Sequence, residues 1–181
     1  MSIVLLGSTS GSCTLQEQAV AGTTVLTLPT VSGTVLTDTS PKAGNVIQVV
    51  NASYGTQVTA NTSTYIDTGL SASITPTSAT SKILVIVHQT GLFKVTGNTR
   101  IALRLLRGST SLIGFEWGAG TTDNTITISP AGSGTTFLDS PATTSSVTYK
   151  TQLASTSNVA EVRVNLDSNS SSTITLMEIA A

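Results

Sequence analysis

Carboxylates are the side chains of this sequence best suited to catalysis, and cleaving a polysaccharide would need two of them facing one glycosidic bond. The candidates stand singly in the sequence, most of them beside Ser, Thr or Asn: Glu116, Asp123, Asp139, Glu161, Asp167 and Glu178. Asp139-Ser-Pro141 has the pattern of a turn or cap. Asp167-Ser-Asn169 begins like a calcium loop but lacks its glycine and closing glutamate, so we interpret it as a turn. We therefore predict no catalytic residues and a protein that is not an enzyme.

The chain has one histidine, His88, and one cysteine, Cys13. His88 follows the apolar run 83–87 and belongs to no nucleophile motif, which favours a strand residue at a sheet end or a packed interface. A metal site would need His88 to meet Asp67 or Glu116, which are merely the nearest acids in sequence. A single cysteine excludes a disulfide within the chain. We predict no metal and no cofactor.

Five of the eight basic residues lie in one acid-free stretch, residues 82–107. If this stretch folds as a hairpin with its turn at 96–98, Arg100 and Arg104 point the same way. Together with Arg107 they would form a cationic patch for an anionic partner, such as a bacterial surface polysaccharide or an acidic capsid surface. We prefer the simpler interpretation, a solvated strand face with isolated salt bridges.

The whole chain has few charged residues. The 181 residues include 8 Lys and Arg against 9 Asp and Glu, a net charge of −1, while Ser and Thr fill 59 positions. No positive field exists to bind nucleic acid, and no apolar run approaches the ~20 residues of a membrane span. A hydrophobic content of 39% argues against disorder. A surface of Ser, Thr, Asn and Gly repels its own copies weakly, which suits a protein held in a fixed assembly.

From residue 43 onward, many short runs with period-two alternation in places are separated by turn signals, which predicts a single all-β domain, a jelly-roll-like β-sandwich. Ile101, Leu103 and Leu105 share one strand face, opposite Arg100, Ala102 and Arg104. Turns are predicted at 107–109, 131–134 and 168–172. Trp117 is predicted in the core, the alternative being an exposed ring on which a sugar stacks. The predicted strands cover residues 45–50, 64–74, 82–95, 99–107, 109–117, 124–128, 147–153, 159–166 and 173–179.

The run 83–87 is apolar at every position, so both of its faces should be covered. A central strand of a sandwich has one face in the core, and the other would then meet a partner surface. We therefore place Ile83, Val85 and Val87 at the interface between three copies of the chain.

Residues 1–42 differ from the rest and contain a near-repeat, Gly22-Thr-Thr-Val-Leu-Thr27 and Gly33-Thr-Val-Leu-Thr37. Two short ribbons cannot close a core alone, because an isolated hairpin is marginal in water. Their apolar side chains must pack on the main domain or on another chain, and we favour another chain. We predict an N-terminal β-ribbon that anchors the protein through Val25, Leu26, Leu28, Val35 and Leu36.

Several of these segments resemble structural proteins of marine bacteriophages, in particular the fibre and head-decoration modules of cyanophages. The similarity spans nearly the whole chain, and it lies in the order of the motifs. The segments are Thr14-Leu-Gln16, Gly22–Pro29, Ser32–Thr37, Gly44–Val49, Tyr65–Ser71, Ile74–Ser78, Ser81–Val85, Leu138–Thr144 and Ser172–Ala180.

The resemblance implies a virion structural protein at the surface of the phage particle, homotrimeric and without enzymatic activity. Residues 1–42 would attach to capsid or tail proteins, and residues 43–181 would project outward. A head fibre or capsid decoration protein is the leading interpretation. A tail-fibre or tail-spike tip that binds host surface glycan is the alternative, and a polysaccharide depolymerase acting through Glu116, Asp139 or Asp167 ranks third.

Overall fold

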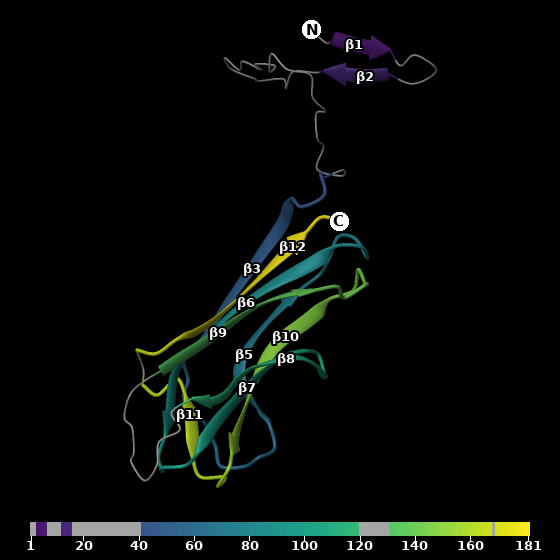
Figure 1. Cartoon of the computed structure of the whole chain (residues 1–181). Helices are drawn as coiled ribbons and strands as arrows, with labels where there is room; N and C mark the ends of the chain where they lie inside the picture. The colour runs from purple at the N-terminus through teal and green to yellow at the C-terminus, as the bar shows by residue number, and fades with distance from the viewer. Residues whose placement is uncertain (1–2, 7–11, 16–40, 120–130, 168) are drawn as a thin grey trace. The chain divides into compact units, whose positions relative to one another are not determined.

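A computed structural model of the chain describes residues 3–6, 12–15, 41–119, 131–167 and 169–181 (Figure 1). The chain divides into two compact units, Met1–Val35 and Leu36–Ala181. In the first unit, β1 (Ile3–Leu6) pairs antiparallel with β2 (Ser12–Leu15). The apolar residues assigned to the anchor, and the strand predicted at 124–128, lie outside the described residues. No helix long and apolar enough to cross a bilayer occurs in the part of the chain that the structure describes.

The second unit is a sandwich of two antiparallel sheets, which confirms the predicted fold class. Its strands are β3 (Val46–Tyr54), β4 (Val58–Ala60), β5 (Ile66–Ile74), β6 (Lys82–Lys94), β7 (Arg100–Arg107), β8 (Thr110–Ala119), β9 (Ala131–Asp139), β10 (Val147–Thr156), β11 (Val162–Val164) and β12 (Ser172–Ile179). One sheet has the order β5-β10-β7-β8, and the other has the order β3-β12-β6-β11-β4, with β9 on the second edge of β6 (Figure 1).

Between the sheets, the inward side chains form two apolar clusters rather than one. The first core cluster includes Val85, Tyr149 and Leu176, and the second includes Leu103 and Leu153. Burying such side chains stabilises the folded state by about 25 cal/mol for each Å² of apolar surface removed from water. The alternation predicted for residues 100–105 is confirmed for Ile101, Leu103 and Leu105, which are 0–1% exposed, but Ala102 on the opposite face is fully buried as well.

A belt of buried polar side chains separates the two clusters, and we call it the polar belt. The Thr68 and Thr151 hydroxyls are 2.5 Å apart, and Thr151 Oγ1 donates to Gln89 Oε1 at 3.0 Å. Gln89 Nε2 donates to Ser172 Oγ, which donates to Asn165 Oδ1. These bonds connect the four-stranded to the six-stranded sheet and satisfy groups that would be costly to bury alone.

The predicted hairpin between residues 82–95 and 99–107 is wrong. β6 and β7 belong to different sheets, and the connection at 95–99 crosses from one sheet to the other. There Asn158 Nδ2 donates to Gly97 O at 3.1 Å. The turn predicted at 107–109 is confirmed: Arg107 pairs with Thr110, and Gly108 has a φ of 57°, as the first central residue of a two-residue hairpin turn requires.

Residues 131–134, predicted to be a loop, begin strand β9. The prediction failed because this segment has no large apolar residue and its strand identity comes from pairing with β6. Gly134 lies opposite His88, and a Cβ atom at Gly134 would lie 2.8 Å from Val87 O. Glycine therefore permits the close approach of the two strands.

Residues 44–45, which lead into β3, and Ala180, which follows β12, lie together at one end of the sandwich. Gly44 N donates to Ala180 O at 2.8 Å, and Ala180 N donates to Asn45 O at 2.9 Å. Because Ile179 pairs with Lys82 at the start of β6, the connection that follows Lys94 lies at the opposite end.

Candidate functional site

An apolar row crosses the outer face of the six-stranded sheet, and we call it the outer apolar row. Strand register places Val49, Met177, Leu84 and Leu138 side by side on β3, β12, β6 and β9. Val49 and Leu138 are 55% and 52% exposed, and the two residues between them are half-buried. Ile86 continues the row along β6 and is also exposed. Exposed apolar groups that gather in this way make the row a candidate interaction surface.

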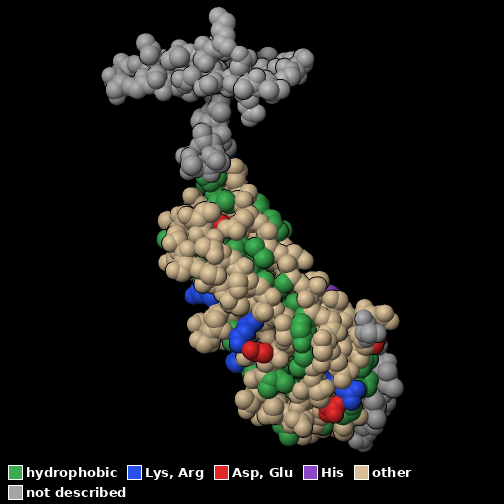
Figure 2. Space-filling model, turned by 180° about the vertical axis from the view of Figure 1, so that it is seen from behind, with side chains coloured by type: hydrophobic (Ala, Val, Ile, Leu, Met, Phe, Trp, Pro, Cys, Tyr) green, Lys and Arg blue, Asp and Glu red, His purple; other side chains and the backbone are tan. Residues whose placement is uncertain are grey.

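The surroundings of the outer apolar row carry little charge. Lys82 is exposed at its margin, whereas Glu178 on β12 points inward and is fully buried. The outer apolar row therefore lacks charges that would attract a strongly charged partner, and it is better matched by another uncharged, apolar surface. The side of the molecule seen in Figure 2 is likewise mostly uncharged, with basic and acidic side chains in a few small groups.

The residues predicted to form the trimer interface lie beneath this surface. Ile83, Val85 and Val87 are 0–2% exposed and belong to the first core cluster of the single chain. They therefore do not form an intermolecular surface. The pattern correctly indicated that both faces of the run are apolar, but it could not distinguish the core face from the outer face, which carries Leu84 and Ile86.

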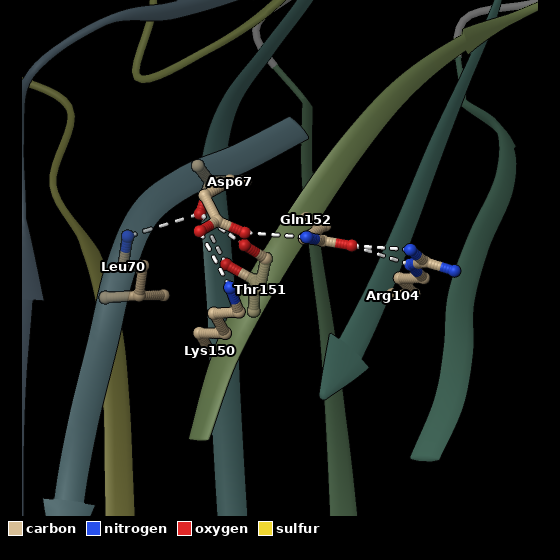
Figure 3. A network of polar contacts seen from close by, with 7 residues as sticks. Asp67, Leu70, Arg104, Lys150, Thr151 and Gln152 are labelled. Atoms are coloured by element: carbon tan, nitrogen blue, oxygen red, sulfur yellow. Dashed lines mark hydrogen bonds and ion pairs between the residues drawn. The ribbon is translucent and has the colours of Figure 1, made fainter. Parts of the chain in front are cut away.

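The outer face of the four-stranded sheet is polar instead and carries a continuous side-chain network (Figure 3). Asp67 accepts from Lys150 Nζ at 2.8 Å and from Gln152 Nε2 at 2.7 Å. Gln152 Oε1 accepts from Arg104 Nε at 2.9 Å and from Arg104 Nη2 at 2.6 Å. The Arg104 guanidinium lies 4.0 Å from the centre of the Tyr65 ring. Burial opposes ionisation of Asp67, but its hydrogen bonds to Lys150 and Gln152 prevail and lower its pKa.

The predicted cationic patch is divided by the structure. Arg100 and Arg104 lie on the outer face of β7, as expected from their spacing, and Arg100 is exposed. Arg107 has the opposite parity and pairs with Asp139 at 2.7 Å. Lys150 on β10, which the sequence pattern had not singled out, is the cation that accompanies Arg104.

Trp117, predicted in the core, is 64% exposed. It lies on β8, an edge strand of the four-stranded sheet, opposite Ala102. The register between β7 and β8 shifts three times, at 101/102, 103/104 and 105/106. Irregularities of this kind turn side chains that simple alternation would place otherwise, and sequence alone did not indicate them.

The carboxylates proposed as catalytic alternatives have structural partners. Asp139 accepts from Tyr149 OH at 2.6 Å as well as from Arg107, so it is neither a turn nor a cap. Burial and this hydrogen bond raise the pKa of Tyr149 well above its usual value. Asp167 accepts from Asn169 N at 2.8 Å, which confirms the predicted turn. Glu116 accepts from Trp117 N at 2.9 Å.

Glu178, another of the carboxylates considered for catalysis, is fully buried and has structural partners too. Gln48 Nε2 donates to its Oε2 at 2.5 Å, and the backbone N and hydroxyl of Thr77 donate to Oε1 at 2.7 Å each. Burial favours the neutral form, but these hydrogen bonds outweigh it and lower the pKa of Glu178.

His88 is an exposed residue in the middle of β6, opposite Gly134. Within the described ranges, no three or more His, Cys, Asp or Glu side chains are grouped so that they could hold a metal ion. The absence of a cofactor stays a prediction.

No protein-family model matches the sequence, and no curated protein matches it. Among solved structures, the chain is similar to the infectious bursal disease virus VP2 subviral particle, with a TM-score of 0.46 and 11% identity over 74% of this chain and 32% of that chain. T=1 particles derived from the same virus give a TM-score of 0.42 and 12% identity over 87% and 41% of the two chains. The chain spans less than half the length of these proteins, and similarity at this level carries no inference about its function.

Proposed function

We propose that this protein is a structural component of a bacteriophage virion that acts as a homotrimer. In this proposal, residues 1–42 attach it to the particle, and the sandwich projects outward as a head fibre or capsid decoration. The order of the phage-like motifs supports the class of protein. The observation that carries the assembly is the outer apolar row, formed by Val49, Leu84, Leu138 and Met177 with Ile86 beside them.

A second copy of the chain is the occupant that this surface suits best. The row has no acidic side chain and one lysine at its margin, so its complement is another uncharged apolar surface. Exposed Val46 extends it along β3 towards residues 41–45, where the description of the sandwich begins. Copies that pack in parallel through the row would bring the starts of their β3 strands together, and we propose that the apolar near-repeats of residues 1–42 then cover one another. Obligate interfaces of this kind resemble a domain core cut in half.

Light scattering after size exclusion tests the assembly on the full chain. At about 10 µM, well above the dissociation constant expected of an obligate interface, we expect the mass of a trimer. The double variant Leu84→Lys/Leu138→Lys should be a folded monomer, because three copies would bury six unpaired ammonium groups. Val159→Lys is the matched control, since Val159 is 45% exposed in the loop at the other end of the sandwich. A monomeric wild type, or a double variant that stays trimeric, would contradict the proposal.

Attachment is tested by incubating virions that lack the protein with the full chain or with residues 43–181. We expect the full chain to bind the particles and the shortened chain to stay in solution while keeping its β-sheet circular dichroism. Binding of the shortened chain at the wild-type level would refute the anchor.

A further inference from the structure

A hollow lies on the outer face of the four-stranded sheet, away from the outer apolar row. It measures about 480 Å³ and is lined by Arg104, Leu106, Gly108, Ser109, Thr148, Lys150 and Gln152. Leu106 is 3% exposed and lies on β7 directly opposite Lys150 on β10. Side chains with amide, hydroxyl, ammonium and guanidinium groups therefore surround an apolar residue. Because Leu106 is almost fully covered, the hollow offers mainly hydrogen-bonding groups, which suit a hydroxyl-rich ligand.

The polar groups of the hollow are held in place before any ligand arrives. Gln152 uses both ends of its amide, donating to Asp67 and accepting two bonds from Arg104 (Figure 3). The guanidinium of Arg104 is also fixed against Tyr65. Ordering these long side chains thus adds little entropic cost on binding.

The network leaves donors free and a surplus of positive charge. Arg104 has five N–H groups and uses two of them on Gln152, and Lys150 uses one of its three on Asp67. Two cations face one carboxylate, Asp67. A carboxylate or sulfate group in the hollow would therefore accept charge-assisted hydrogen bonds from both cations.

An exposed aromatic ring adjoins these cations. Trp117 lies opposite Ala102, which is two residues, or about 7 Å of strand, from Arg104. At Gly114, opposite Arg104 on β8, a Cβ atom would meet nothing nearer than Leu103 O at 3.8 Å, so no side chain covers the sheet at that position. A chain molecule can therefore lie across the ring of Trp117 and reach the hollow.

We infer that this face binds an acidic saccharide, with a carboxylate or sulfate group held between Arg104 and Lys150 and a neighbouring sugar ring stacked on Trp117. The site uses the sheet opposite the outer apolar row, so it remains open if copies assemble through that row. A particle that carries this protein would then hold a charged host glycan at several equivalent positions.

Titration calorimetry on the full chain tests the inference with three probes: alginate oligosaccharides, chondroitin sulfate oligosaccharides and neutral dextran oligosaccharides. We expect one or both acidic probes to bind more tightly than dextran and to weaken with added salt. Trp117→Ala and Lys150→Gln should each weaken binding about tenfold, since each removes one contact of about 1.4 kcal/mol. Arg100→Gln is the matched control, because Arg100 is exposed on the same strand but does not line the hollow.

Two results would overturn the inference: no heat of binding with either acidic probe, or equal losses for Arg100→Gln and Lys150→Gln. Retention of full affinity by Trp117→Ala would overturn the stacking contact in particular. None of these outcomes depends on the trimer, because the mass of the protein is measured separately.

Discussion

Replacing Gln89 by alanine tests whether the polar belt contributes to stability. Gln89 lies in the middle of β6 and is fully buried. Its Oε1 accepts from Thr151 Oγ1 at 3.0 Å, and its Nε2 donates to Ser172 Oγ at 2.7 Å. The substitution removes both bonds and the only direct side-chain link described between Thr151 on one sheet and Ser172 on the other.

The expected loss follows from what each partner keeps. A neutral hydrogen bond contributes about 1 kcal/mol net to folding, and truncating a buried side chain leaves a cavity that costs a further amount of similar size. Thr151 keeps its bond with Thr68, and Ser172 keeps its bond with Asn165, so neither hydroxyl becomes unpaired. We expect Gln89→Ala to lower the free energy of unfolding by about 3 kcal/mol.

Urea unfolding at a fixed protein concentration measures this loss, because oligomerisation would otherwise shift the apparent stability. Gln57→Ala is the matched control: the same side chain is exposed there, and we expect a change of less than about 0.5 kcal/mol. If Gln89→Ala unfolds within about 0.5 kcal/mol of the wild type, the polar belt is not a source of stability and the reasoning fails.

Three other variants give separate tests. Because folding lowers the pKa of Glu178, its ionised carboxylate stabilises the fold above the unfolded pKa of about 4.3, and this stabilisation is lost as the pH falls through the folded pKa. Glu178→Gln should therefore make the free energy of unfolding depend less on pH in this acid range. An unchanged pH dependence would count against this role of Glu178. Asp139→Ala leaves Arg107 and the buried hydroxyl of Tyr149 without their partner and should cost about 3 kcal/mol in thermal unfolding. Gly134→Ala should speed amide hydrogen exchange in β9, because its Cβ would approach Val87 O; protection equal to the wild type would show that the strands adjust freely.

Alternation along the sequence predicted most of the sandwich, because half-buried strands leave a period-two pattern. It could not predict the partners of each strand. The turn at 96–98 has the residues of a hairpin, yet β6 and β7 enter different sheets, since a sandwich also needs connections that cross between layers. β9 was missed because its N-terminal half has no large apolar side chain and depends on β6 for its pairing.

The surfaces were harder to predict than the strands. The apolar run 83–87 indicated two covered faces, but only the register with β12 and β9 reveals that Leu84 belongs to an exposed row. The predicted members of the cationic patch were partly wrong for a similar reason. Arg107 has a buried partner 32 residues away, and Lys150 lies near Arg104 on a strand remote in sequence. Long-range pairing of this kind leaves no local pattern.

The backbone bonds that join Gly44 and Asn45 to Ala180 bear on how the protein could be engineered. A tag or reporter appended after Ala181 would emerge next to Gly44 and Asn45, where the chain enters the sandwich. A foreign epitope is better grafted into the loop around Asn158 or into the neighbouring connection at 95–99, which lie at the other end of the sandwich. There it would lie far from the bonds that join Gly44 and Asn45 to Ala180.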